Sequence, residues 1–145
     1  MKILILNGPN LNLLGARDQS NYGQLSLDQI QSLIISEFPN DTFEFVQSNT
    51  EGDLVEQIQN ADGSYDGLII NPGGYAHTSI AIRDALELAK LPKIEVHLSN
   101  LSQREDFRQK MITAPKTNGY ISGFKDLSYL AGIYLIKKIA ESSSK

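Results

Sequence analysis

The chain has 145 residues, of which 41% are hydrophobic, and a formal net charge of −4 from 13 Lys and Arg against 17 Asp and Glu. This size and composition predict a single globular domain over residues 1–145. The acidic balance, without a basic run among aromatic residues, argues against a nucleic-acid partner. The absence of cysteine excludes a disulfide framework, a thiolate nucleophile and a Cys-based zinc site.

Neither a signal peptide nor a membrane span is expected. The first apolar run, "MKILIL", ends at Asn7, Gly8 and Pro9 before it reaches the length of a signal peptide. No later apolar run is long enough to cross a bilayer. We therefore expect a cytoplasmic protein without a membrane partner.

Short apolar runs alternate along the chain with segments of helical periodicity. The runs predict strands at 2–7, 42–47, 67–71, 93–98 and 119–124. The periodic segments predict helices after Ser26, at 50–60, from Thr78 or Ser79, and at 126–140, followed by a frayed tail at 141–145. This alternation predicts an α/β fold, a flavodoxin-like doubly wound parallel sheet of five strands in the order 2-1-3-4-5.

Two helices have more specific signals. Ser26 is followed three residues later by Gln29, which is the spacing of a capping box. The helix from Thr78 or Ser79 carries an apolar set that we expect to face inward: Ile80, Ala81, Ala85, Leu88 and Ala89.

Segment 8–24 connects the first strand to the first long helix and is unusually long for such a connection. Connections of this length are either functional lids or solvated loops. Arg17 and Tyr22 lie five residues apart in it, and Asn10 lies near its start. A tyrosine becomes a base near pH 7 only when its phenolate is stabilised by roughly 4 kcal/mol, which nearby guanidinium groups can supply. We therefore predict a lid at 8–24.

The segment "NPGGYAHTSIAIRD" follows the third strand and can be interpreted in two ways. Its Pro and Gly residues are typical of a turn, with Thr78 or Ser79 as the helix N-cap. Alternatively, Asn71 and His77 form a polar cradle for hydroxyls or an anion. Asp84, in the following helix, suits a surface or interface contact.

The fourth strand and the residues after it, "KIEVHLSN", place an acid, an imidazole and a hydroxyl on one face. Side chains alternate along a strand, so Glu95, His97 and Ser99 point to the side opposite Ile94 and Val96. A lone strand histidine is usually structural. Here Glu95 can orient His97 and favour its charged form, and ligands bind at the carboxyl ends of such strands.

The residues after this strand complete the candidate site. The backbone amides of Leu98 and Ser99 can hold a carboxylate. Arg104 and Arg108 have i, i+4 spacing on a predicted short helix, which can bring either guanidinium to the same edge. A solvated charged turn is the alternative.

Other chemistries fit the sequence poorly. The two histidines lack the HExxH spacing of a zinc site, and the chain has neither GxxxxGK[ST] nor GxGxxG after its first strand. Asn7 and Asn71 stand where a phosphorylation receiver would need acidic side chains.

These motifs resemble the type II 3-dehydroquinate dehydratase family over nearly the whole chain. The matching segments, in order, are "NGPNLNLLG", the pair Arg17 and Tyr22, "QSNTEGDLVEQI", "NPGGYAHTSIAIRDAL", and "IEVHLSN" followed by "REDFR". The chain departs from the family pattern at "RDQ" in the lid, in the "FRQKM" run and at Lys125. None of these departures removes a catalytic group.

The resemblance implies a cofactor-free and metal-free lyase. It would catalyse the trans elimination of water from 3-dehydroquinate through an enolate, in the shikimate pathway or in quinate breakdown. Catalytic roles carry over as follows: Tyr22 as proton acceptor, His97 as proton donor, Arg17 as transition-state stabiliser, Asn10 as enolate stabiliser and Glu95 as the residue that orients His97. Substrate-binding positions carry over to Asn71, His77, Asp84, Leu98, Ser99 and Arg108, with Asp84 reaching a neighbouring subunit in a dodecamer of four trimers.

Two other functions stay open at the level of sequence. The first is a non-catalytic binding module with the same pocket. The presence of both Tyr22 and His97 argues against it, because a binding module needs neither a tunable base nor an acid. An isomerase would use the same base and acid, so the residues alone do not exclude it.

Overall fold

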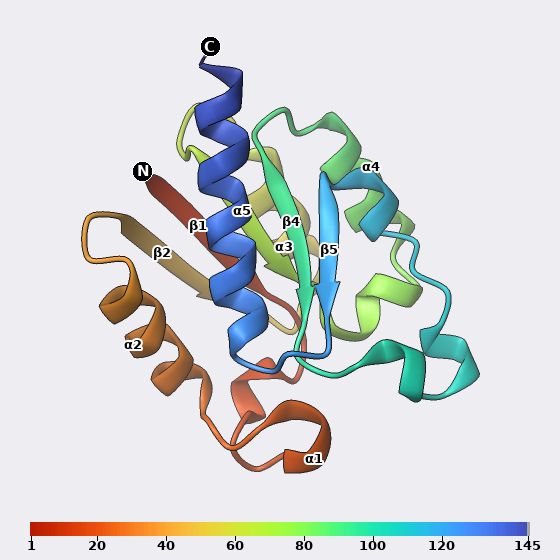
Figure 1. Ribbon diagram of the computed structural model, residues 1–145. Coiled ribbons are helices and arrows are strands. Elements are labelled where there is room, and N and C mark those ends of the chain that lie inside the picture. Colours follow the sequence, from red (N-terminus) through yellow and green to blue (C-terminus); the bar gives the residue numbers. More distant parts are fainter. Residues whose placement is uncertain (145) are drawn as a thin grey trace.

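The computed structural model describes residues 1–144, which form one five-stranded sheet between two layers of helices (Figure 1). The strands are β1 (Lys2–Asn7), β2 (Thr42–Gln47), β3 (Gly67–Asn71), β4 (Lys93–His97) and β5 (Gly119–Ser122). All neighbouring strands pair in parallel in the order β2-β1-β3-β4-β5, which confirms the predicted fold class. Within residues 1–144, no helix is both long and apolar enough to cross a membrane.

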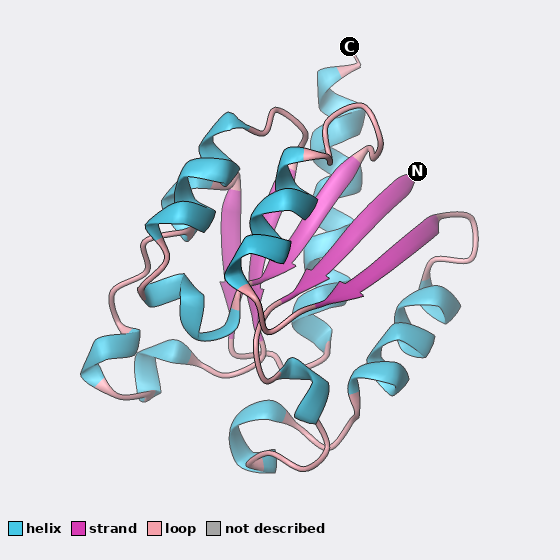
Figure 2. Ribbon diagram, turned by 180° about the vertical axis from the view of Figure 1, so that it is seen from behind, coloured by secondary structure: helices cyan, strands magenta, loops and turns pink. Residues whose placement is uncertain are grey.

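Helices cover both faces of the sheet because the central strands are apolar on both sides. Figure 1 shows α2 (Leu27–Glu37) and α5 (Leu127–Ser143) on one face, and Figure 2 shows α3 (Glu51–Gln59) and α4 (Ile80–Leu88) on the other. Alternate residues of β1 enter two separate cores, Ile3 and Ile5 on the α2/α5 side and Leu4 and Leu6 on the α3/α4 side. Parallel strands buried on both faces read as continuous apolar runs, as these do.

The predicted capping box is present at the start of α2. Gln29 N donates to the Ser26 side chain, and Ser26 N donates to Gln29 Oε1. Two amide groups at the helix N-terminus, which lack partners within the helix, are thereby satisfied. The prediction of this helix from its sequence is confirmed.

The inward face predicted for α4 is partly wrong. Ala85 and Ala89 are buried, but Ile80 and Leu88 are 65% and 74% exposed, and Ala81 is also exposed. The buried positions of α4 include Ile82 and Leu86 instead. The helix is apolar on more than one side, so periodicity alone did not identify the side that faces the sheet.

The C-terminal helix is longer than expected. Residues 141–143, predicted as part of a frayed tail, continue α5, and Lys145 lies outside the described residues. Ser142 and Ser143 Oγ donate to the carbonyls four residues earlier, and Lys138 Nζ lies 2.8 Å from Glu141 Oε2. These local bonds satisfy polar groups in the last turn of the helix.

Candidate active site

The carboxyl ends of β1, β3 and β4 lie at one edge of the sheet, and segment 8–24 lies beside them (Figure 1). Gly8 allows this close approach. A Cβ atom at Gly8 would lie 2.5 Å from the Pro72 carbonyl oxygen, and Gly8 N donates to Asn71 O at 2.7 Å. Asn10, two residues further along the loop, has a φ of 67°, a left-handed conformation that Asn tolerates better than most residues. The loops after β1 and β3 therefore meet at the point where this fold binds ligands.

Tyr22 lies at the end of a short helix, α1 (Gln19–Tyr22), within segment 8–24. Asp18 caps α1 by accepting from the backbone N–H and the hydroxyl of Ser20. These hydrogen bonds lower the pKa of Asp18. Asp18 belongs to the "RDQ" departure from the family pattern, and its carboxylate anchors the helix that carries Tyr22.

Two guanidinium groups converge on the Tyr22 hydroxyl. Arg17 Nη2 donates to the phenol oxygen at 2.8 Å, and its Cζ lies 3.9 Å from the centre of the ring. Arg104 Nη1 donates to the same oxygen at 3.0 Å and to Ser99 Oγ at 2.9 Å. The Tyr22 hydroxyl is therefore held at the cavity by two cationic hydrogen-bond donors.

The imidazole of His97 is oriented by the buried carboxylate of Glu95, which contacts its Nε2 atom. Glu95 is 0% exposed and His97 5%. Glu95 Oε2 lies 2.7 Å from His97 Nε2, and Glu95 Oε1 accepts from the Thr113 hydroxyl. Because an ionised carboxylate only accepts, Nε2 carries a proton, and Nδ1 is the ring nitrogen available to the cavity.

His77 lies beside this pair. Its ring is stacked against that of His97, with 6.3 Å between the ring centres. Its Nδ1 lies 2.8 Å from the Lys110 carbonyl oxygen, so Nδ1 carries the proton. Burial lowers the pKa of His77, and the charges of His97 and Arg108 act in the same direction. The neutral ring that results presents Nε2 as an acceptor, for example to a ligand hydroxyl.

These side chains line one small cavity of about 100 Å³. Nine of the predicted site residues line it, namely Asn10, Arg17, Tyr22, Asn71, His77, His97, Leu98, Ser99 and Arg108. Glu95 lies behind His97, and Asp84 is exposed on α4 and does not line this cavity. Among the described residues that line the cavity, three are arginines and none is acidic, which favours an anionic ligand.

Arg104 was one of two arginines that the sequence placed at this edge, but no role was assigned to it. Both Arg104 and Arg108 line the cavity, but the predicted short helix is two separate 3₁₀ turns, Leu101–Gln103 and Asp106–Arg108. Arg104 reaches the Tyr22 hydroxyl. Both arginines lie near Glu105 Oε2, Arg108 Nε at 2.7 Å and Arg104 Nε at 3.5 Å. The i, i+4 spacing was the only signal for Arg104, and it did not distinguish the two residues.

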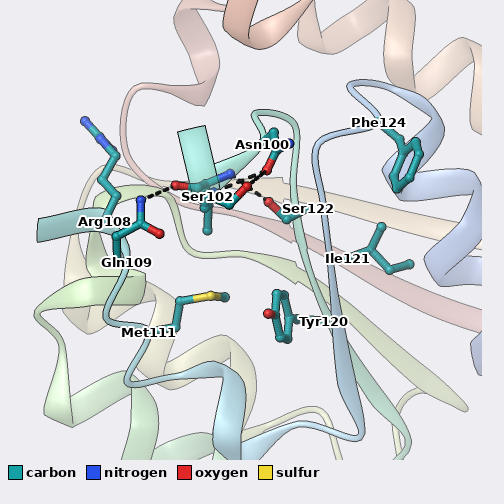
Figure 3. Close-up of a pocket in the computed structure, with 10 residues that line it drawn as sticks. Asn100, Ser102, Arg108, Gln109, Met111, Tyr120, Ile121, Ser122 and Phe124 are labelled. Atoms are coloured by element: carbon teal, nitrogen blue, oxygen red, sulfur yellow. Dashed lines mark hydrogen bonds between the residues drawn. The ribbon is translucent and has the colours of Figure 1, made fainter. Parts of the chain in front are cut away.

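A larger cavity of about 520 Å³ lies beside this one but suits ligand chemistry less well (Figure 3). Several of its polar side chains bond to other protein groups. Asn100 Oδ1 accepts from Ser102, Gln109 Nε2 donates to Leu101 O, and Ser122 Oγ donates to Ser99 O. Within residues 1–144, no cluster of three or more His, Asp or Glu side chains is arranged to hold a metal ion. The smaller cavity is therefore the candidate site.

Comparison with known proteins identifies the family. Residues 1–137 match the family model described as Dehydroquinase class II. The chain belongs to this family. A 3-dehydroquinate dehydratase of Geotalea daltonii is 52% identical over 139 residues, which cover 94% of this chain and 96% of that protein. One of Aliarcobacter butzleri is 47% identical over 141 residues, covering 96% of this chain and 86% of that protein.

Solved structures agree with this assignment. The type II dehydroquinase of Butyrivibrio crossotus superposes with a TM-score of 0.91 at 42% identity, covering 94% of this chain and 97% of that one. The type II dehydroquinase of Propionibacterium acnes gives a TM-score of 0.87 at 34% identity, covering 94% and 96%. The class II dehydroquinase fold is thus shared over nearly the whole length of the chains.

Proposed function

We propose that this chain is a 3-dehydroquinate dehydratase that removes water from 3-dehydroquinate to give 3-dehydroshikimate, in the shikimate pathway or in quinate breakdown. One observation carries the proposal. A tyrosine under two guanidinium groups and a histidine held by a buried carboxylate line the same small cavity. A base and an acid in one positively charged cavity are what an elimination from an anionic substrate needs.

The first half of the reaction is assigned to the lid side of the site. Tyr22, as the phenolate, removes the C2 proton beside the ketone, and the C–H electron pair forms an enolate. Arg17 and Arg104 stabilise the phenolate before the transfer and the developing charge during it. Asn10, through a water molecule, stabilises the enolate oxygen.

The second half is assigned to β4. The enolate collapses to the ketone and forms the C1–C2 double bond, while the C1 hydroxyl leaves. His97 donates the Nδ1 proton to this hydroxyl, so water leaves rather than hydroxide. Glu95 stabilises the imidazolium before the transfer and the Nε2–H form of the ring after it.

The remaining polar groups are assigned to substrate binding. Arg108 and the backbone amides of Leu98 and Ser99 hold the substrate carboxylate, and Asn71 and His77 hold its hydroxyls. Nδ1 of His77 already donates to Lys110 O, which leaves Nε2 as the acceptor for a hydroxyl. No cofactor or metal takes part in this scheme.

A dodecamer of four trimers in the cytoplasm is the assembly and location that we propose. Exposed apolar side chains on α4, Ile80 and Leu88, support an interface there, next to Asp84. In that assembly Asp84 reaches the site of a neighbouring subunit. Multi-angle light scattering after size-exclusion chromatography should give the mass of twelve chains, and a monomer would contradict the proposed assembly. The cysteine-free composition suits a reducing compartment.

The function is tested by adding 3-dehydroquinate to the purified protein and following the ultraviolet absorbance of the conjugated enone product. We expect the absorbance to rise with a rate proportional to protein concentration. No rise at any pH from 6 to 9 would contradict the proposal. Consumption of substrate without enone formation would favour an isomerase instead.

A further inference from the structure

Thr113 is a buried polar residue that the reaction scheme does not yet use. Its side chain is 0% exposed, as is that of Glu95, and its Oγ1 donates a hydrogen bond to Glu95 Oε1. The other oxygen of Glu95, Oε2, lies 2.7 Å from His97 Nε2. Three side chains from two segments of the chain thus form one hydrogen-bonded series that ends at the candidate proton donor.

The two contacts of Glu95 fix the plane of its carboxylate. A buried carboxylate oxygen without a hydrogen-bond donor is costly, and the Thr113 hydroxyl supplies that donor. With Oε1 held by Thr113, Oε2 has one orientation in which to accept the Nε2 proton of His97. The carboxylate that orients the imidazole is therefore itself oriented.

The backbone around Thr113 is held by the connection after β3 and by α4. Ile112 N donates to Ala76 O at 2.8 Å, and Arg83 Nη1 donates to Ile112 O at 2.7 Å. Two residues before Ile112, the Lys110 carbonyl accepts from His77. The hydroxyl of Thr113 is thus placed by contacts on the residue before it.

We propose that Thr113 is a positioning residue for the proton donor. It holds Glu95 so that the Nε2–H of His97 stays hydrogen-bonded to Glu95 Oε2. The imidazolium then presents Nδ1–H to the substrate, and the neutral ring left after the transfer is the Nε2–H form. The kinetic part of this inference rests on the proposed function, whereas the effect on the His97 tautomer does not.

Thr113→Val tests the proposal because valine keeps the shape of threonine and removes the hydroxyl. Thr113→Ser restores the donor. Thr117→Val is a matched control in the same connection, since Thr117 Oγ1 bonds Ala114 O and Gly119 O and not Glu95.

The first readout is the ¹⁵N NMR spectrum of the histidine rings at a pH where they are neutral. The chain has two histidines, so one His77 variant assigns both signals. We expect the wild type, Thr113→Ser and Thr117→Val to show the Nε2–H form of His97. Thr113→Val should show a mixture of Nε2–H and Nδ1–H forms.

The second readout separates the two half-reactions. In Thr113→Val we expect kcat for dehydration to fall by about tenfold to a hundredfold, the scale of a hydrogen bond to a charged group. KM and the rate at which the C2 proton exchanges with solvent should stay within about twofold of wild type, because Tyr22 is untouched. Thr113→Ser should recover most of kcat.

An unchanged His97 tautomer in folded Thr113→Val would overturn the proposal. So would an equal loss of C2 exchange and of dehydration, because that pattern indicates a general structural defect. If Thr113→Val does not fold, failure of Thr113→Ser to keep the Nε2–H form decides against the proposal. If the wild type does not dehydrate 3-dehydroquinate, the proposed function fails and the tautomer comparison still judges the role of Thr113.

Discussion

The two sides of the candidate site are built differently. On the acid side, Glu95, His97 and Thr113 are buried at 0%, 5% and 0% exposure, next to one strand of the sheet. On the base side, Tyr22 lies on a four-residue helix in a surface segment and is held by guanidinium groups that line the cavity. The proposed acid, His97, is therefore fixed by the core of the protein, whereas the position of the proposed base, Tyr22, depends on the conformation of a loop.

Because of this difference, substitutions on the two sides of the site should have different effects on activity. Core positions hold a catalytic group in one geometry before the substrate arrives. A loop position can move to admit the substrate and then close over it. Substitutions on the acid side should therefore change the rate of dehydration without changing how segment 8–24 opens and closes. Substitutions on the base side should change both.

The largest effect is expected for Tyr22→Phe, which removes the proton-accepting oxygen and keeps the ring. We expect kcat to fall by at least about 10³-fold, with the fold and substrate binding retained. Circular dichroism and isothermal titration with substrate check the fold and binding. Tyr120→Phe is the matched control, because Tyr120 is 57% exposed on β5 and should not affect turnover. Near wild-type turnover of Tyr22→Phe would show that another group is the base.

A smaller loss is expected for Arg104→Ala, which leaves Arg17 as the one guanidinium on the Tyr22 hydroxyl. We expect kcat to fall about tenfold to a hundredfold, and Arg104→Lys to recover only part of it because lysine lacks the planar fork. Arg108→Ala, four residues on, should instead raise KM. Steady-state kinetics of the three variants give kcat and KM separately. A rise in KM without a fall in kcat in Arg104→Ala would contradict a role of Arg104 at the Tyr22 hydroxyl.

A change of about tenfold is expected in the accessibility of segment 8–24. Arg17 is its only basic residue, so trypsin cleavage after Arg17 reports on the segment. If cleavage needs an open lid, an anionic substrate analogue at ten times its Kd should slow it about tenfold. Cleavage after the exposed Lys90 should not change. Equal rates at Arg17 with and without the analogue would argue that the segment does not close.

The smallest effect is expected for Asp18→Ala, which removes the cap of α1. We expect KM to rise about twofold to fivefold with little change in melting temperature, since α1 buries none of its residues. Hydrogen bonds from Ser20 lower the pKa of Asp18 in the folded protein below its unfolded value of about 3.8. The stabilisation from the cap is therefore fully present above about pH 3.8 and is lost as the pH falls through the pKa of the folded state. Asp28→Ala, on α2, controls for the lost charge. An unchanged KM would mean that Asp18 does not support the lid.

The sequence was sufficient for the acid side and less so for the base side. The alternation along 93–98 places Glu95 and His97 together, because neighbours at i and i+2 on a strand share a face whatever else the chain does. Arg104 and Arg108 could not be distinguished, because 3₁₀ turns replaced the expected helix and changed where each side chain points. Thr113 is 18 residues from Glu95, and no local pattern indicates that the two bond.

The same reasoning applies to the fold. The five strands and the capping box of α2 follow from local residue patterns and were confirmed, with β4 and β5 ending one and two residues before the predicted ends. The inward face of α4 was misjudged because Ile80 and Leu88 are apolar but exposed in this chain. Exposed apolar side chains carry the same signal in the sequence as apolar side chains of the core.

The division between a base on the lid and an acid on β4 is tested most directly by His97→Ala in deuterated solvent. The variant keeps Tyr22 and both arginines, so it should still exchange the C2 proton of 3-dehydroquinate for deuterium while forming no enone. Tyr22→Phe, measured by NMR under the same conditions, should show neither exchange nor dehydration. Loss of exchange in His97→Ala together with exchange in Tyr22→Phe would contradict the assignment of the two roles.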